Sequence, residues 1–222
     1  MLDDGRGFCT ASLISPDVIL TVAHCLFDKD TGQKYPLDAF EFQAAWRHGY
    51  AEAYRGIKST LTHPKYRFNS TKDVEKVSQG VAMVLLDHPI QNGRIDPFVV
   101  APLPKQGEDV AVVSYARGRK NAPSIQSRCT VAARQDGILV MTCDVDYGAS
   151  GSPVFQITSQ GVVIVSVISA MAILKEQKVS LGVPLETSLV DLNYLAQQSG
   201  MLPLEPGQTL QRRFIGAKFT RP

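Results

Sequence analysis

The sequence has no long apolar run. No stretch reaches the roughly 18 to 20 consecutive apolar residues that cross a bilayer, and the first residues, MLDDGRGF, contain no apolar core of an export signal. The chain is therefore expected neither to span a membrane nor to carry a targeting segment of its own.

The sequence also has little excess of charge of either sign. Lysine and arginine together number 23 and aspartate and glutamate 21, so the formal net charge is only +2. This balance does not indicate a nucleic-acid or membrane partner. Hydrophobic residues make up 44% and charged residues 20% of the chain, which is ordinary for a soluble globular protein and excludes disorder of the whole chain.

Typical metal-ligand spacing is missing as well. The sequence contains no C-x-x-C pair and its histidines are scattered, which makes zinc the weaker interpretation of the four cysteines. Cys9 and Cys25 flank one expected hairpin, and Cys129 and Cys143 flank another. We therefore expect two disulfides, Cys9–Cys25 and Cys129–Cys143, and an oxidising compartment. No metal and no cofactor are expected.

Short β-rich runs are what the sequence does contain, at residues 11–15, 18–23, 40–46, 80–87, 109–116, 137–143, 161–170 and 179–185. Strands at this spacing, without long amphipathic segments between them, predict an all-β fold. Prolines and a glycine between 100 and 108 mark the expected join of two β halves, 1–103 and 104–187. One helix is expected at 188–199, where leucines recur at helical spacing before Gly200.

Residues 200–222 are expected to form a basic tail. Its basic side chains are interleaved with aromatic and aliphatic ones: Arg212, Arg213, Phe214, Ile215, Lys218, Phe219 and Arg221. Such a tail could contact nucleic acid or a membrane surface. The favoured interpretation is a tail that docks on the body through its aromatics or frays, and no nucleic-acid partner is expected.

Two motifs carry a family resemblance. FCTASLISPDVILTVAHC ends in His24 and Cys25, and GASGSPVF holds Ser150 in a tight G-x-S-G turn. Together with LTHPKY and LLDHPI between them, they resemble the chymotrypsin-like (trypsin-fold, S1-type) serine proteases, in their bacterial-type branch. The resemblance spans residues 7–198. It implies two six-stranded antiparallel Greek-key β-barrels, a C-terminal helix and a site in the cleft between the barrels.

The resemblance implies that Ser150 is the nucleophile and His24 its general base. A serine hydroxyl attacks poorly until a base accepts its proton, so an imidazole must lie within reach. Gly148 allows the backbone to turn, so that its own amide and that of Ser150 point at one spot and stabilise an oxyanion.

The third member of the family's triad has no counterpart. Gly80 stands where the orienting aspartate is expected, while Ser169 matches the serine that supports that aspartate. Asp73, in an expected loop, is a weak substitute, because a loop carboxylate is more often a solvated charge. We expect catalysis to be impaired and Gly80→Asp to raise it by at least about a hundredfold.

The residues that recognise the substrate are harder to predict from the sequence. Asp144 lies six residues before Ser150, where trypsin-like members keep the carboxylate of the S1 pocket. A structural acceptor in its own loop is the favoured alternative. Ser169, Ala170 and Met171 are expected to line the cleft, with a substrate strand pairing along 167–171.

The sequence therefore predicts a serine endopeptidase that forms a Ser150 acyl-enzyme on peptide or protein substrates. The alternative is a catalytically silent relative that binds peptides or proteins in the same cleft. A periplasmic or secreted location is expected, through an export signal absent from this chain.

Overall fold

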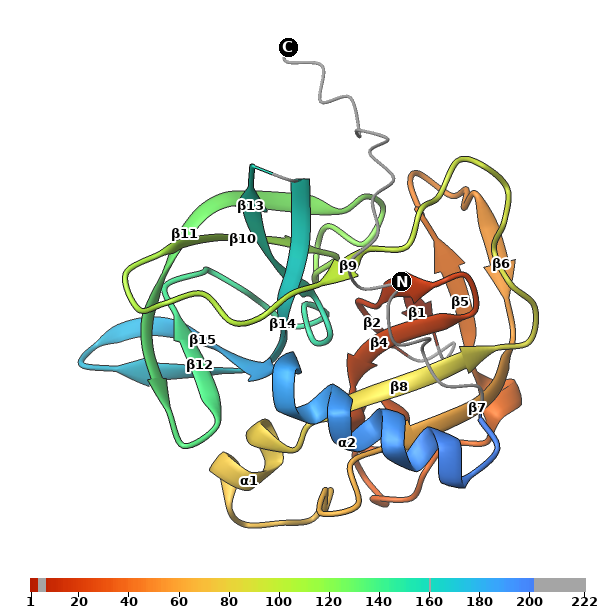
Figure 1. Ribbon diagram of the computed structural model, residues 1–222, viewed down its shortest axis with the longest axis horizontal. Coiled ribbons are helices and arrows are strands. Elements are labelled where there is room, and N and C mark those ends of the chain that lie inside the picture. Colours follow the sequence, from red (N-terminus) through yellow and green to blue (C-terminus); the bar gives the residue numbers. More distant parts are fainter. Residues whose placement is uncertain (4–6, 160, 202–222) are drawn as a thin grey trace.

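The computed structural model describes residues 1–3, 7–159 and 161–201, so nearly all of the predicted basic tail lies outside the described residues. The chain forms two β-barrels that lie side by side (Figure 1). The second barrel is a closed ring of six antiparallel strands in the order β13-β10-β11-β12-β15-β14, because β14 pairs with β13 as well as with β15. These strands are β10 (Asp109–Ser114), β11 (Ser124–Gln135), β12 (Ile138–Met141), β13 (Pro153–Thr158), β14 (Gly161–Leu174) and β15 (Gln177–Pro184).

The first barrel is built from two four-stranded sheets, ordered β2-β1-β5-β6 and β3-β4-β8-β7. The strands are β1 (Leu2–Asp3), β2 (Phe8–Cys9), β3 (Ser12–Ser15), β4 (Val18–Val22), β5 (Glu41–Ala44), β6 (Ala53–Arg55), β7 (Ile57–Thr62) and β8 (Val81–Leu86). The chain passes directly from β6 to β7 through Gly56, and from β2 to β3 through Thr10 and Ala11. Each of these pairs is one bent strand shared by both sheets, so the first barrel is also a ring of six.

Both rings have the same topology. In each, the fourth strand of the barrel lies beside the first, which gives the spatial order 4-1-2-3 of a Greek key, and the fifth and sixth strands close the ring. The prediction of an all-β fold with two six-stranded antiparallel Greek-key barrels is therefore confirmed. A short strand in the segment between the barrels, β9 (Val99–Val100), pairs in parallel with β14 of the second barrel.

The strands β4 and β8 are buried on both faces. One face, with Leu20 and Met83, packs with residues of the second barrel and of the C-terminal helix such as Val167 and Leu192. The other face, with Ile19 and Val84, packs inside the first barrel. This shared core explains why both strands are continuous apolar runs, and it holds the two barrels together.

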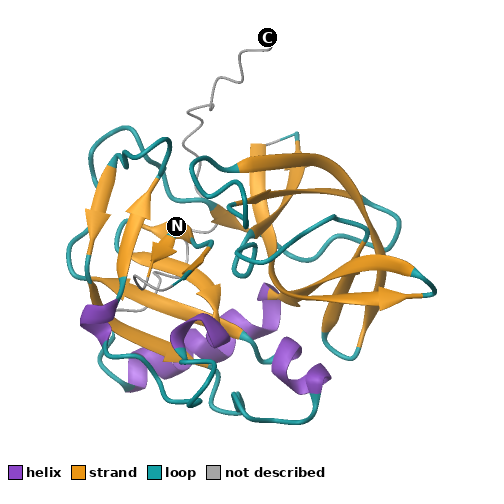
Figure 2. Cartoon of the chain, turned by 180° about the vertical axis from the view of Figure 1, so that it is seen from behind, coloured by secondary structure: helices purple, strands orange, loops and turns teal. Residues whose placement is uncertain are grey.

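The predicted C-terminal helix is confirmed as α2 (Leu185–Gln198), which begins directly after β15 at Pro184. It packs against β14 and β15 of the second barrel and against β7 and β8 of the first (Figure 1). The prediction of a single helix was wrong, because α1 (Asp73–Ser78) forms where a loop was expected. Two 3-10 turns, η1 (Ala23–Leu26) and η2 (Leu37–Ala39), complete the helical elements seen in Figure 2.

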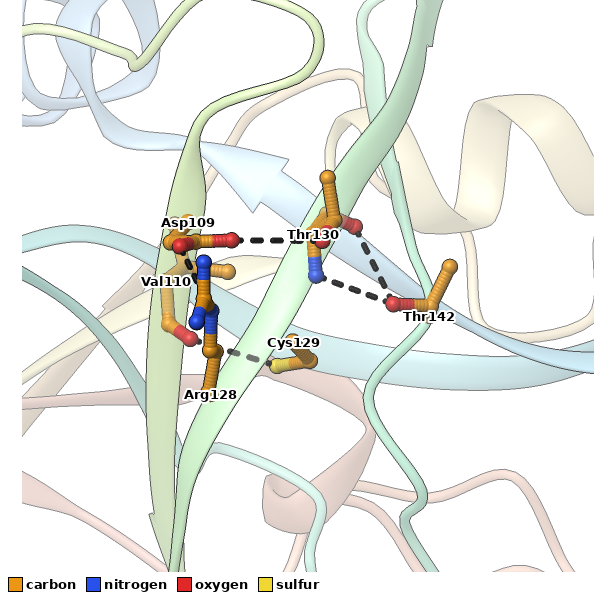
Figure 3. A network of polar contacts seen from close by, with 6 residues as sticks. All are labelled: Asp109, Val110, Arg128, Cys129, Thr130 and Thr142. Atoms are coloured by element: carbon orange, nitrogen blue, oxygen red, sulfur yellow. Dashed lines mark hydrogen bonds and ion pairs between the residues drawn. The ribbon is translucent and has the colours of Figure 1, made fainter.

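Both predicted disulfides are present, Cys9–Cys25 and Cys129–Cys143. The second joins β11 to the segment after β12, and a polar network surrounds it (Figure 3). Thr130 N donates to Thr142 Oγ1 at 2.9 Å, and Arg128 Nε donates to Asp109 Oδ2 at 2.8 Å. These contacts hold the edges of β10 and β11 and the segment that leads into the Ser150 turn.

In the described part of the chain, no helix has the length and apolar character that crossing a membrane would require.

Candidate active site

His24 lies in η1, directly after β4, and is partly buried. Its neighbour Cys25 is bonded to Cys9, and the ring nitrogen of His24 lies within 4.8 Å of both sulfur atoms. Because these sulfurs are bonded to each other, they are not thiolates that could bind a metal ion together with the histidine. The disulfide therefore fixes the segment that carries the imidazole.

Ser150 lies in a tight turn between β12 and β13 that requires glycine at two positions. Gly148 has φ +92°, and a Cβ atom there would lie 2.7 Å from the Phe8 ring. Gly151 has φ +78°, and a Cβ atom there would collide with Thr10 O and Thr21. Positive φ and close packing together exclude other residues at both positions.

The amides of this turn divide into two groups. Ala149 N donates to Asp146 O at 2.9 Å, Gly151 N to Ile168 O at 2.8 Å and Ser152 N to Ala149 O at 3.0 Å. Within the described residues, the amides of Gly148 and Ser150 donate to nothing. An oxyanion hole needs two donors that have no other acceptor, and the resemblance assigned that role to these two amides.

A closed series of contacts brings the histidine and serine segments together. On one side, Thr10 N donates to Ser150 O at 2.8 Å, and Thr10 follows Cys9, the disulfide partner of Cys25. On the other side, Ala23 N donates to Gly80 O at 2.6 Å. Gly80 faces Ser169, whose neighbour Ile168 exchanges hydrogen bonds with Gly151 and Ser152. The segments that carry His24, Gly80, Ser169 and Ser150 are thus linked to one another at the barrel interface.

Among residues 1–3, 7–159 and 161–201, no carboxylate makes a hydrogen bond or an ion pair with the imidazole. Within the described residues, neither ring nitrogen of His24 makes a hydrogen bond or an ion pair, and the Oγ atom of Ser150 is also without a partner. Gly80 is buried, and the space beside it is taken by main-chain oxygens of α1. A Cβ atom at Gly80 would lie 2.5 Å from Lys76 O, 3.0 Å from Val77 O and 3.1 Å from Ser169 Oγ.

Within the described residues, the charge that shifts the pKa of His24 is the positive charge of Lys76. Burial, and then the ammonium group of Lys76, lower the pKa of His24 from its ordinary 6.5 to about 4. Lys76 is half-buried on α1, with its Nζ atom 5.9 Å from the centre of the Phe68 ring. The imidazole is thus neutral at neutral pH and free to accept a proton, but no group of the described residues stabilises the imidazolium that would form.

The structure does not bring Asp73 to His24. Asp73 is the exposed first residue of α1, one helical turn before Lys76, and it makes no hydrogen bond or ion pair within the described residues. The charge on this helix that shifts the pKa of His24 is that of Lys76 and not that of Asp73.

Asp144 is on the surface of the second barrel. Its side chain is 79% exposed, its carboxylate lies 2.9 Å from Lys178 Nζ, and its amide donates to Gln126 Oε1 at 2.7 Å. Lys178 therefore pairs with the carboxylate for which the sequence left open either a place in the S1 pocket or a hydrogen-bonding role in its own loop. Ala170 and Met171 continue β14 beyond Ser169 and are partly buried.

Comparison with known proteins now identifies the family. Residues 5–164 match the family model described as the trypsin-like peptidase domain, which is more than half of the chain. The chain belongs to this family. It is also 25% identical over 126 residues to a modular serine protease of Drosophila melanogaster, covering 54% of this chain and 19% of that protein. The chain thus spans about one fifth of the length of this relative.

Two solved structures share the fold of this trypsin-like peptidase domain. One is a thermostable serine protease, AL20, from an extremophilic microorganism, with a TM-score of 0.66 and 18% identity over 88% of this chain and 94% of that one. The other is a Glu endopeptidase in complex with MPD, with a TM-score of 0.69 and 18% identity over 87% of each chain.

Sequence reasoning missed several residues around the site of this trypsin-like domain. Thr10 is buried, its Oγ1 donates to Gly148 O at 3.2 Å and accepts from Tyr115 N at 3.2 Å, and its carbonyl accepts from Thr21 Oγ1 at 3.0 Å. The position of Thr10 directly after a disulfide cysteine was the one available signal. Lys76 and Lys178 carried none, because their roles depend on how α1 and β15 pack.

Proposed function

We propose that this trypsin-like peptidase domain is a serine endopeptidase in which Ser150 attacks the peptide carbonyl and His24 accepts the hydroxyl proton. The observation that carries the proposal is the pair of free amides at Gly148 and Ser150, in a turn whose other amides are all bonded. A developing oxyanion beside Ser150 would receive two hydrogen bonds at no cost to the fold. The imidazole returns the proton to the leaving amine, and water then releases the acyl group.

The missing carboxylate sets the expected rate. In the triad that serves as the general example for this family, replacing the aspartate by asparagine lowers kcat about ten-thousandfold. Here no carboxylate in the described part of the chain is bonded to the imidazole, and Lys76 disfavours the imidazolium. Activity is therefore expected to be far below that of a complete triad, but above the uncatalysed rate, because the oxyanion hole and the bound geometry still contribute.

A second function has specific support. The main-chain oxygens of Lys76 and Val77 fill the space beside Gly80, so the absence of the aspartate is built into the packing of α1. A cleft that has lost its orienting residue but kept its shape would still bind peptides. The alternative is therefore a catalytically silent relative that holds a peptide or protein segment in the same cleft.

The substrate or ligand is proposed to be an extended peptide that pairs with β14 along residues 167–171, by β-augmentation. Ser169 and Met171 would provide its main-chain contacts, with Ala170 between them, and no cofactor is required for acyl transfer by this mechanism. The two disulfides favour an oxidising location, which is proposed to be the periplasm or the cell exterior.

Labelling with a fluorophosphonate probe tests the proposal, because the probe modifies only an activated serine. The native chain is expected to label slowly, and Ser150→Ala is expected not to label. Ser124→Ala, which removes a partly buried serine outside the turn, serves as the matched control and should label like the parent. No labelling of the native chain, or equal labelling of Ser150→Ala, would reject the peptidase and favour the silent relative.

A further inference from the structure

The strand β14 has one free edge, and this edge begins at Ser150. Between Gly161 and Val167, β14 pairs with β13 on one side, and from Ser166 to Leu174 it pairs with β15 on the other. The pairing with β13 stops where the Ser150 turn begins, since Gly151 and Ser152 exchange hydrogen bonds with Ile168. Beyond Ile168 the described residues offer no partner strand on that side.

The tip of the β14–β15 hairpin determines which groups face this edge. Lys175 and Glu176 form a two-residue turn with φ +48° and +65°, as in a type I′ hairpin. The pair that flanks such a turn, Leu174 and Gln177, is hydrogen-bonded, and bonded pairs alternate along the ladder. The amides and carbonyls of Met171 and Ile173 therefore point away from β15, towards the free edge.

A register shift near Ser169 sets this alternation. Ile168 pairs with Gly182, whereas Ala170 pairs with Leu181, so one extra residue is inserted at Ser169. A bulge of this kind exchanges the two sides of the strand. It allows Ile168 to bond to the Ser150 turn while Met171 and Ile173 expose their main-chain groups on the same side.

Exposed apolar side chains lie on both faces of this part of the strand. Ile173, on the same face as Met171, is 79% exposed, and Leu174, on the opposite face with the small residues Ala170 and Ala172, is 51% exposed. An unpaired edge with exposed apolar side chains is unusual in a protein that avoids aggregation, because such an edge readily accepts another strand. Its continuity with the candidate site indicates an extended peptide as that strand.

We infer that the peptide-binding cleft extends along β14 to Ile173, so that the protein recognises at least five residues before the cleaved bond. This inference rests on the proposed function, because it adds a subsite to the same cleft. In an antiparallel strand whose first residue before the cleaved bond lies beside Ser169, the third residue opposes Met171 and the fifth opposes Ile173. The fifth residue forms two main-chain hydrogen bonds with Ile173, and an apolar side chain there packs on the Ile173 side chain.

The experiment measures binding to Ser150→Ala, so that it does not depend on catalysis. Peptides are selected on this variant from a random decapeptide library, and the tightest one is synthesised with a fluorescent label for anisotropy measurements. Each amide of the peptide is then methylated in turn. N-methylation is expected to weaken binding about 10- to 100-fold at three alternating positions that span five residues, and to have little effect at the positions between them.

Variants of the protein test the same edge. Ile173→Pro removes an amide hydrogen that β15 does not use, and should weaken binding about tenfold. Ile173→Ala should weaken binding about threefold, through the lost cross-strand contact. Ile157→Ala, which truncates an isoleucine that is 71% exposed on β13, is the matched control and should not change binding.

Three outcomes would overturn the inference: no peptide is selected, the alternating pattern covers three residues or fewer, or Ile173→Ala binds like the control. A concentration-dependent increase in molar mass that Ile173→Pro abolishes would also overturn it, by showing that a second copy occupies the edge. If the alternating pattern covers five residues but the protein is not labelled by the fluorophosphonate, peptide binding along the β14 edge is supported and the peptidase is rejected. Fluorophosphonate labelling without that alternating pattern would support the peptidase and reject peptide binding along the β14 edge.

Discussion

Gly80 faces the hydroxyl group of Ser169, because a Cβ atom at Gly80 would lie 3.1 Å from Ser169 Oγ. The resemblance to the family implied this neighbour, since the serine normally supports the orienting aspartate. What the resemblance did not imply is the position of α1. The carbonyl oxygens of Lys76 and Val77 lie 2.5 and 3.0 Å from the same Cβ position, where the side chain of an aspartate would begin.

Gly80→Asp is therefore expected to be costly. The Cβ atom alone requires the main chain at Lys76 to move, and the carboxylate would then lie among carbonyl oxygens that repel it. We expect a loss of about 1–3 kcal/mol in the free energy of unfolding, measured by urea denaturation. Fluorophosphonate labelling is expected to rise less than about tenfold, compared with the hundredfold rise that the sequence alone suggested.

Gly80→Ala is the control for this substitution, because it introduces the Cβ atom without the charge. It should lower the stability by a similar amount and leave labelling unchanged. A Gly80→Asp protein that is as stable as its parent and labels a hundredfold faster would show that α1 yields easily. The expectation from the sequence, that Gly80→Asp restores the triad, would then be confirmed.

The low pKa of His24 predicts an unusual pH profile. Burial and the charge of Lys76 lower this pKa to about 4, so the imidazole should stay neutral down to about that pH. The rate of labelling is expected to rise with pH through about 4 and to reach its plateau below pH 6. In Lys76→Gln the pKa of His24 rises, so the acidic limb of the profile should move to higher pH.

Stability should follow the same pKa. In the unfolded chain the histidine has its ordinary pKa of 6.5, so between pH 6.5 and 4 the unfolded chain binds more protons than the folded one. The contribution of His24 to stability is fully present above pH 6.5 and is lost as the pH falls towards 4. Lys76→Gln should narrow this window, whereas Lys58→Gln, which removes an exposed lysine on β7, should not. Equal profiles for the two variants would exclude a role for Lys76.

The strands that the sequence predicted best are those buried on both faces. VILTV and VAMVLL form β4 and β8, with every side chain buried. In contrast, β11 was predicted only as one arm of the hairpin between Cys129 and Cys143 and was absent from the β-rich runs, because only Cys129 and Val131 of its twelve residues are buried and the remainder shows no alternating apolar pattern. The helix α1 was missed because its six residues bury one side chain, Val77, which is too little for a helical period to be recognised.

The candidate site shows the same division. His24 and Ser150 could be predicted because each lies in a local motif whose spacing is tied to its chemistry. The surroundings of His24 could not, since the charge of Lys76 acts on the imidazole only because α1 packs against the second barrel. For Asp144, sequence offset alone suggested a pocket, whereas the structure pairs it with Lys178 on the neighbouring β15. Long-range packing decides such pairings.

Asp144 is expected to have little influence on substrate preference. Its carboxylate is exposed and already paired with Lys178, and surface pairs of this kind contribute about 0–1 kcal/mol. In Asp144→Asn, the ratio of cleavage after basic to cleavage after uncharged residues should change less than about threefold. Long digestion of a peptide library, read by mass spectrometry, gives this ratio even at a low rate. A loss of about a hundredfold after basic residues would place Asp144 in the S1 pocket after all.

His63 links the first barrel to the C-terminal helix. Its Nδ1 atom accepts a hydrogen bond from Lys65 N at 3.2 Å, so in the neutral ring the proton is on Nε2, which lies 3.1 Å from Asp191 Oδ2 on α2. The histidine is buried, whereas the aspartate side chain is 60% exposed. Removing the acceptor leaves a buried N–H group without a partner, which is the costly half of breaking a hydrogen bond.

Asp191→Ala is therefore expected to lower the free energy of unfolding by about 1–2 kcal/mol. Asp191→Asn keeps an oxygen at the same place and should cost less than half as much. Gln197→Ala, which truncates an exposed side chain on the same helix, should change stability by no more than about 0.5 kcal/mol. Urea denaturation of the three variants gives the comparison. If Asn and Ala at 191 are equally destabilising, charge and not the hydrogen bond joins α2 to His63, and if neither differs from Gln197→Ala, the shared core of β4, β8 and α2 holds the helix without this contact.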